Sequence, residues 1–201
     1  MTPPTLTFER QYLDKGYRLI AGVDEVGRGC LAGPVVAGAV IFNCHENLPD
    51  GIDDSKKLSP AKRLLLDGQI RGAALAFGIG YADVDEIDKL NIFHASRLAM
   101  VRAISQLNPL PDFVLVDGNF SVPHSVKQHS VVAGDQKSVS IAAASILAKV
   151  YRDNWMNRFE ALYPGFGFAK NKGYGTFEHR QALTLKGPTE IHRKTFCWTR
   201  V

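Results

Sequence analysis

Four acidic side chains stand at or near the ends of apolar runs, and these are the residues that could carry chemistry. Asp24 and Glu25 close the run "IAGVDE", Asp117 closes "FVLVD", and Asp135 closes "SVVAGD". Buried carboxylates are costly unless they are paired or bound to a cation. Hard divalent ions such as Mg²⁺ and Mn²⁺ prefer oxygen ligands. If the four acids converge, they predict a Mg²⁺ or Mn²⁺ site.

Each of these acids also has a simpler explanation. An aspartate at a strand end can cap the turn or helix that follows. Neighbours on a regular strand point to opposite faces, so Asp24 and Glu25 can both be inner ligands only if the strand breaks at the Gly27-Arg28-Gly29 turn. Glu25 could otherwise act through a water or its backbone carbonyl. Asp153 is the rival for the last acid, but next to Arg152 in a long helical pattern a local ion pair is its simpler role.

The stretch "DSKKL" (Asp54–Leu58) is a candidate phosphate-binding loop. It places the hydroxyl of Ser55 and the ammonium groups of Lys56 and Lys57 just before a predicted helix, an arrangement that suits phosphate. A solvated run of charge explains the same residues equally well.

The stretch "NKGYGTFEH" places the aromatic ring of Tyr174 between two glycines and close to Lys172. An aromatic ring on a flexible basic loop can stack on a base or sugar. A hinge with an anchoring tyrosine is the alternative. His179 and His192 follow in the basic tail without metal-ligand spacing, and the sequence assigns them no role.

The elements expected around the acids indicate an α/β fold. Tyr17–Glu25 and Pro34–Phe42 read as strands joined by a glycine-rich turn, which predicts a hairpin. In an α/β sheet, sites form at the carboxyl ends of strands. Further strands are expected at 75–83, 113–118 and 126–135, and helices from Ser59 or Pro60, from Asn91, from Ser138 to Pro164 and near Thr176–Leu185. The first dozen residues are expected to be loosely packed or disordered.

Composition indicates one main globular unit with a basic tail. The chain has 201 residues, 45% hydrophobic and 22% charged. Residues 165–201 hold seven Lys or Arg against two Glu, which suits a polyanionic partner. Three cysteines (Cys30, Cys44, Cys197) without metal spacing favour a reducing compartment. The sequence shows no signal peptide and no stretch able to span a bilayer, so a cytoplasmic location is expected.

Six motifs together resemble the type 2 ribonuclease H family, represented by bacterial ribonuclease HII. They are "AGVDEVGRG", "DSKKLS", "LNIFHAS", "VLVDGN", "AGDQKSVSIAAASILAKVYRD" and "NKGYGT", within about Tyr17–Phe196. The resemblance implies catalytic acids at Asp24, Glu25, Asp117 and Asp135. It also implies substrate contacts at Gly27, Arg28, Gly29, Ser55, Lys56 and Lys57, and a junction-sensing tyrosine at Tyr174. The run "QKS" after Asp135 and the tail "FCWTRV" depart from the expected pattern, and no clamp-binding signature is recognised at the C-terminus.

The resemblance further implies a ribonuclease H-like mixed sheet flanked by helices, with a small helical C-terminal element. The expected division is a catalytic domain over 13–164 with a basic element over 165–201 packed on it. The implied activity is metal-dependent hydrolysis of RNA in RNA·DNA hybrids and incision 5′ of ribonucleotides embedded in duplex DNA. The products would carry 5′-phosphate and 3′-hydroxyl ends, and the protein is expected to be a monomer. A binding module without chemistry and a type 3 ribonuclease H are the alternatives.

Overall fold

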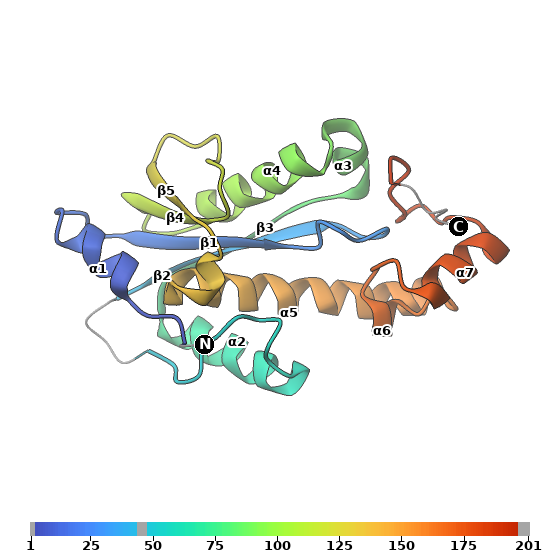
Figure 1. Ribbon diagram of the computed structural model, residues 1–201, viewed down its shortest axis with the longest axis horizontal. Coiled ribbons are helices and arrows are strands. Elements are labelled where there is room, and N and C mark those ends of the chain that lie inside the picture. The colour runs from blue at the N-terminus through green and yellow to red at the C-terminus, as the bar shows by residue number, and fades with distance from the viewer. Residues whose placement is uncertain (1–2, 44–47, 197–201) are drawn as a thin grey trace.

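One mixed sheet organises the computed structural model, which describes residues 3–43 and 48–196 (Figure 1). The strands are β1 (Ile20–Val26), β2 (Val35–Phe42), β3 (Ala74–Ala82), β4 (Phe113–Asp117) and β5 (Lys127–Val131), in the order β3-β2-β1-β4-β5. β2 lies antiparallel to β1 and to β3, which confirms the expected hairpin, and β4 lies parallel to β1 and to β5. The central strand β1 therefore has an antiparallel neighbour on one side and a parallel neighbour on the other.

Helices cover both faces of the sheet. They are α1 (Thr7–Leu13), α2 (Pro60–Ala73), α3 (Val84–Leu90), α4 (Ile92–Ser105), α5 (Val139–Leu162), α6 (Phe168–Asn171) and α7 (Phe177–Lys186), with a 3₁₀ turn η1 at Gly134–Gln136. Figure 1 shows α4 on one face, and α5 with α2 on the other. The helices expected from the sequence are confirmed. Ser59 and Ser138 cap α2 and α5 by accepting backbone N–H groups.

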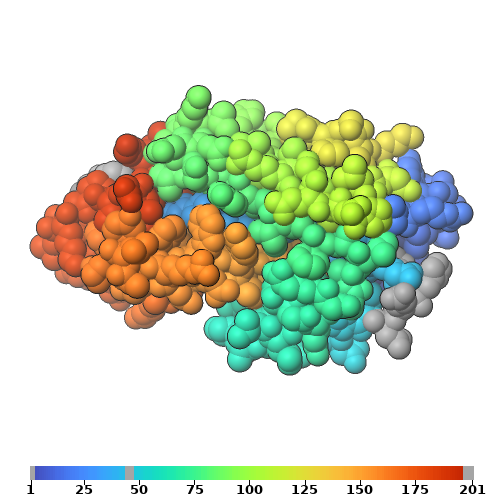
Figure 2. Space-filling model, turned by 180° about the vertical axis from the view of Figure 1, so that it is seen from behind, coloured from blue at the N-terminus to red at the C-terminus, as the bar shows by residue number. Residues whose placement is uncertain are grey.

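The far end of α5 leads into the C-terminal element of α6, α7 and the segment after them. Figure 2, seen from behind, shows this red and orange part at one end of an elongated body, with the blue N-terminal part at the opposite end. The element packs on the body through a cluster that joins Leu31 and Ala32 to Met156, Phe168 and Leu183. The tail is thus continuous with the core.

Alternation along β1 decides which side chains face which helix. Ala21 and Val23 belong to the core packed against α4, whereas Ile20 belongs to the opposite face. Gly22 also lies on that opposite face, against α5. A β-carbon there would lie 2.2 Å from the Ser140 carbonyl carbon. Asp24, two residues further along β1, must therefore point to the α5 side.

Glycines allow the backbone of α5 to rest directly on the sheet. At Gly38 of β2, a β-carbon would lie 2.3 Å from the carbonyl oxygen of Ala144, nearly as close as the contact at Gly22. Real β-carbons do not approach other atoms so closely, so only glycine fits at either position. The first turns of α5 are held immediately beneath the carboxyl-terminal half of β1.

The expectation of a loosely packed N-terminus is wrong for the residues that the structure describes. Residues 7–13 form α1, whose Glu9 is buried and accepts hydrogen bonds from the hydroxyl of Ser138 (2.6 Å) and the N–H of Ser140 (3.0 Å). The Tyr12 ring stacks on Phe113 with centroids 3.8 Å apart. The Glu9 carboxylate satisfies the Ser140 N–H in the first turn of α5, and this contact stabilises the docked position of the short helix.

The predictions about cysteines and membrane spans can be checked only for the residues that the structure describes. Cys30 is buried and has a free thiol, whereas Cys44 and Cys197 lie outside the described residues. Within 3–43 and 48–196, no helix combines the length and apolarity needed to cross a bilayer.

Candidate active site at the carboxyl ends of the central strands

Asp24 and Asp117 lie side by side because of the strand register. Val23 of β1 pairs with Val116 of the parallel strand β4, so the next residue of each strand is an aspartate. Asp24 is only 4% exposed, and its carboxylate accepts hydrogen bonds from the Ser145 hydroxyl on α5 and from the N–H of Glu25 (2.6 Å). Burial, followed by the charges of Glu25 and Asp117, raises the pKa of Asp24 well above its usual range.

Glu25 leaves β1 on the face opposite to Asp24, because β1 stays regular through Val26. Its charge nevertheless raises the pKa of Asp24, so the two carboxylates remain near each other. Glu25 Oε1 accepts a hydrogen bond from Arg28 at 3.1 Å. Its Oε2 is buried without a hydrogen-bond partner among the described residues. Burial raises the pKa of Glu25 to about 7 even though Arg28 opposes the shift. This side chain therefore carries an uncompensated oxygen next to the aspartates.

Asp135 lies close to the other aspartates, but it is positioned by a turn and not by the strand end expected from the sequence. The expected strand over 126–135 is shorter, since β5 ends at Val131 and Asp135 lies in the 3₁₀ turn η1. The Gly134 N–H donates to Asp117 Oδ1 at 2.6 Å and thereby joins η1 to β4. Burial raises the pKa of Asp135, the Lys56 ammonium opposes the shift, and the Asp117 charge adds to it. The Asp117 charge thus acts on both Asp24 and Asp135, which places the three carboxylates in one group.

The loop before α2 divides into residues that reach this group and one that does not. Ser55 is buried, and its Oγ lies 3.0 Å from Oγ of Ser145, the same hydroxyl that contacts Asp24. The Lys56 ammonium lies 3.4 Å from Asp135 Oδ2, while its side chain is 80% exposed. Lys57 instead pairs with Asp53 at 3.1 Å on the surface. Of the two lysines, Lys56 is therefore the one that contacts an acid of the site while most of its side chain stays exposed.

The glycine–arginine–glycine turn (27–29, the GRG turn) has one buried and one exposed glycine. Gly27 is buried with φ of 96°, and a β-carbon there would lie 2.2 Å from Nε of Arg152. Gly29 is exposed, and a β-carbon there would have none of the described atoms within 4 Å. Gly27 is thus required by an internal arginine, whereas Gly29 leaves the outer surface open to close approach.

Two fully buried arginines behind this turn were missed by sequence reasoning. Arg193 donates to the carbonyls of Gly27, Arg28 and Gly33, at 2.6–3.0 Å. Arg152 donates to the carbonyls of Ala32, Pro34 and Lys172 in the same range. A signal for Arg152 was present, because it lies four residues from both Ala148 and Met156 on the buried stripe of α5.

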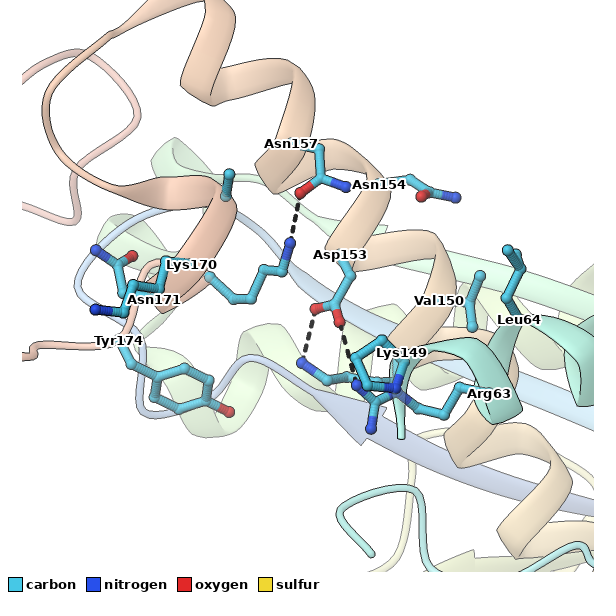
Figure 3. Close-up of a pocket in the computed structure, with 13 residues that line it drawn as sticks. Arg63, Leu64, Lys149, Val150, Asp153, Asn154, Asn157, Lys170, Asn171 and Tyr174 are labelled. Carbon is cyan, nitrogen blue, oxygen red and sulfur yellow. Dashed lines mark hydrogen bonds and ion pairs between the residues drawn. The ribbon is translucent and has the colours of Figure 1, made fainter. Parts of the chain in front are cut away.

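Tyr174 lines a groove of about 630 Å³, at a point where the tyrosine loop (171–176) meets the segment after the GRG turn. Its backbone forms a bridge with Cys30, and its side chain is partly exposed. The groove lies between α2, α5 and α6, and its cationic lining residues are Arg63, Lys149, Lys170 and Lys172. Figure 3 labels the first three of them. None of the four acids lines the groove.

Asp153 occupies this groove away from the other acids. Its carboxylate lies 2.7 Å from the Lys149 ammonium and 4.0 Å from the Arg63 guanidinium, and Figure 3 shows it between the two. The expected local ion pair is confirmed, but its partners are Lys149 and Arg63, because Arg152 turns inward.

The donor set fits a hard divalent cation. Within the residues that the structure describes, no three Asp, Glu, His or Cys side chains already form an ion-binding group. Carboxylate oxygens nevertheless come from β1, β4 and η1, and the buried Oε2 of Glu25 lacks a partner. Aspartate and glutamate oxygens are the ligands that Mg²⁺ and Mn²⁺ prefer.

The mixed sheet and its flanking helices place this chain in the ribonuclease H class of nucleases, because solved structures of that class share the fold. The ribonuclease H2 from Pyrococcus horikoshii OT3 matches with a TM-score of 0.76 and 26% identity, covering 90% of this chain and 94% of that one. The family model "Ribonuclease HII" matches residues 21–199. The chain belongs to the ribonuclease HII family and is therefore an enzyme, a type 2 ribonuclease H of the hydrolase class.

Curated relatives support the same family. Ribonuclease HII of Geobacter sulfurreducens is 52% identical over 194 residues, covering 96% of this chain and 89% of the relative. Ribonuclease HII of Bacillus subtilis is 53% identical over 195 residues, covering 94% and 74%. A ribonuclease HIII described as in complex with Mn²⁺ shares the fold, with a TM-score of 0.72 at 17% identity, covering 90% of this chain and 67% of that one. Membership in the HII family excludes the type 3 alternative and the binding module without chemistry.

Proposed function

We propose that this protein is a Mg²⁺- or Mn²⁺-dependent endonuclease acting on RNA joined or paired to DNA. It would hydrolyse RNA in RNA·DNA hybrids and incise 5′ of ribonucleotides embedded in duplex DNA, leaving 5′-phosphate and 3′-hydroxyl ends. The observation that carries the proposal is the convergence of Asp24, Asp117 and Asp135 on one face of the sheet, with Lys56 beside them. The catalytic role of these acids is part of the proposal.

In this mechanism the acids hold the cation and the surrounding residues orient the acids. When bound, the cation would lower the pKa of the attacking water and stabilise charge on the departing 3′ oxygen. Ser145 fixes Asp24 by a hydrogen bond, and the Gly134 N–H fixes Asp117. Lys56 would exchange its contact with Asp135 for a substrate phosphate. Glu25 would contribute its unpaired Oε2 from the opposite side of β1.

The choice of cleavage position would come from the GRG turn and the tyrosine loop. The exposed backbone at Gly29 can approach a 2′-hydroxyl, the group that distinguishes RNA from DNA. Tyr174 would stack on the deoxyribose that follows, so that only an RNA-to-DNA step fits both elements. The bridge between Cys30 and Tyr174, which sets the two elements next to each other, supports this arrangement.

The basic groove beside Tyr174 offers a path for the nucleic-acid backbone. Four cationic side chains line it. Among the ion pairs of the described residues, two of these side chains, Lys149 and Arg63, pair with Asp153. Phosphate contacts of this kind fix the position of a duplex without reading its sequence. We also propose that the protein acts as a cytoplasmic monomer, which size-exclusion chromatography with light scattering would test for the oligomeric state.

The metal site is tested by Asp117→Asn. Asparagine keeps the oxygen that accepts the Gly134 N–H but removes a charged ligand, so the fold should persist. We expect cleavage of a hybrid and of a duplex with one ribonucleotide to fall by at least about 1,000-fold in Mg²⁺, with hybrid affinity nearly unchanged. Labelled-duplex cleavage and fluorescence-anisotropy binding measure the two quantities.

Asp153→Asn is the matched control, since it removes a partly buried carboxylate from the neighbouring groove. It should keep most of the activity. Substantial Mg²⁺-dependent cleavage by Asp117→Asn, or an equally deep loss in Asp153→Asn, would contradict the assignment of the acids.

A further inference from the structure

Two buried histidines behind Tyr174 form a hydrogen-bond chain with one possible direction. His179 and His192 are both 0% exposed, and their Nε2 atoms lie 3.0 Å apart. The Thr189 N–H donates to His192 Nδ1 at 2.9 Å, so this Nδ1 is an acceptor and His192 Nε2 carries the proton. His179 Nε2 must then accept, which leaves His179 Nδ1–H to donate to the Tyr174 carbonyl at 2.9 Å. The chain runs from Thr189 to Tyr174.

This chain requires both imidazoles to be neutral, and their surroundings favour that state. The rings of Phe166 and Phe168 pack against both histidines, and the positive charge of Arg180 acts on His179. Burial lowers the pKa of His179, and burial together with the neighbouring imidazole lowers the pKa of His192 to about 4. Near neutral pH neither ring carries a charge, so the direction of the chain holds.

The residue after His192 binds the other substrate-reading element. Arg193 donates to the carbonyls of Gly27 and Arg28 in the GRG turn. The backbone on either side of His192 also bonds to the segment after that turn. The Gly33 N–H donates to the Ile191 carbonyl (2.8 Å), and the Arg193 N–H donates to the Leu31 carbonyl (2.9 Å). One dipeptide thus connects the GRG turn to the tyrosine loop.

We infer that His192 and Arg193 are positioning residues that hold the GRG turn and the tyrosine loop at a fixed separation and so set the preference for a single RNA-to-DNA step. The inference rests on the proposed function of those two elements. His192 acts through His179 on the Tyr174 backbone, and Arg193 acts on the GRG carbonyls. Neither side chain touches the substrate.

A long hybrid can offer many registers to the acids, whereas a single embedded ribonucleotide offers one. Loss of the fixed separation should therefore cost more on the single-ribonucleotide duplex than on the hybrid. A displacement of about 1 Å in a positioning element can reduce a rate by up to about 100-fold. The ratio of the two cleavage rates is consequently the quantity to measure, because a general loss of folded protein lowers both rates equally and leaves the ratio unchanged.

The test uses two substitutions of one residue that keep different parts of the chain. His192→Gln can place an amide N–H near the former Nε2 and retain the bond to His179, whereas His192→Asn reaches only the former Nδ1 position and keeps the Thr189 bond. We expect His192→Asn to lower the ratio of single-ribonucleotide to hybrid cleavage in Mn²⁺ by about tenfold. His192→Gln should stay within about threefold of the wild type.

Coupling to Tyr174 provides the second readout. If His192 acts through Tyr174, adding His192→Asn to Tyr174→Ala should not change the ratio further, and the double-mutant cycle should show strong coupling. Equal ratios for His192→Asn and the wild type, or full additivity with Tyr174→Ala, would overturn the inference. Should His192→Asn not fold, His179→Asn removes the same hydrogen bond between residues 179 and 192 while keeping the bond to the Tyr174 carbonyl. The same lowered ratio of single-ribonucleotide to hybrid cleavage is then expected.

The direction of the chain can be measured in the unmodified protein. Long-range ¹H–¹⁵N spectra distinguish the two imidazole tautomers, and we expect the Nε2–H form for His192 and the Nδ1–H form for His179. Any other pair of tautomers would overturn the inference. A wild-type protein that cuts neither substrate would instead refute the proposed function, while the tautomers would still report on the hydrogen-bond chain.

Discussion

At the scale of single residues, the acids of the site are held at a cost to stability. Burial raises the folded-state pKa of Glu25 to about 7 from an ordinary value of 4.5. The folded protein therefore keeps this proton over a range in which the unfolded chain has lost it. Stability from this group is complete below about pH 4.5 and falls as the pH rises to about 7. Asp24 shifts in the same direction.

Glu25→Gln should remove this penalty, because glutamine keeps an acceptor for Arg28 without the charge. We expect the variant to be more stable than the wild type at pH 8 in EDTA by on the order of 2–3 kcal/mol, and equal to it near pH 4.5. Thermal or urea unfolding at the two pH values measures the difference. Added Mg²⁺ should close the gap at pH 8 by stabilising the wild type alone. A difference in free energy of unfolding between the two proteins that changes with neither pH nor Mg²⁺ would contradict the assignment of Glu25 to the proposed metal site.

At the scale of elements, the loop before α2 should separate the effects of two adjacent lysines. Lys56 is exposed and points to Asp135, whereas Lys57 is held by Asp53. Replacing both with alanine should weaken hybrid binding with little dependence on base sequence. The slope of log K against log salt should become shallower by about 1 for each phosphate that a lysine no longer neutralises. We expect Lys56→Ala to account for most of this change and Lys57→Ala for little.

Anisotropy titrations at four or five salt concentrations would provide the slopes. An unchanged slope in the double variant would return the loop to the simple explanation of solvated surface charge.

Elements with a strong local pattern were predictable, and those defined by distant partners were not. The β1–β2 hairpin, the capped start of α2 and the length of α5 follow from glycines, Ser-Pro and apolar spacing. Helix α1 was missed because its stability comes from Glu9 binding the start of α5, a contact across more than 120 residues. Helix α3 was missed although Asp83 and Glu86 form a capping box.

The site shows the same division between local and distant information. Apolar runs ending in acids identified the positions that meet on the sheet, but Asp135 reaches them from a 3₁₀ turn and not from a strand end. No local pattern marks Ser145 as a partner of Asp24 or Arg193 as a ligand of the GRG turn. These contacts join segments up to 166 residues apart and exist only once the sheet has formed.

At the scale of the whole molecule, the C-terminal element shares its core and its hydrogen bonds with the body. The proposed division into 13–164 and 165–201 is thus one of composition and position, without a linker to separate the parts. Phe168 and Leu183 pack on Leu31, and Arg193 reaches Gly27. The candidate active site and the element that would recognise the junction should accordingly unfold together, as one cooperative unit.

The direct packing of α5 on glycines of the sheet determines which glycine-to-alanine substitutions can raise the thermal stability of the enzyme. Exchanging glycine for alanine usually stiffens the unfolded chain and raises the melting temperature. Gly22 and Gly38 are closed to this strategy, since a methyl group would lift α5 off the sheet and carry Ser145 away from Asp24. Gly68 and Gly72 in α2 are open, because a methyl group at either position would have none of the described atoms within 4 Å. Each alanine there should raise the free energy of unfolding in urea by about 0.5–1 kcal/mol and leave the cleavage rates unchanged. Gly22→Ala should lower both the free energy of unfolding and the cleavage rate.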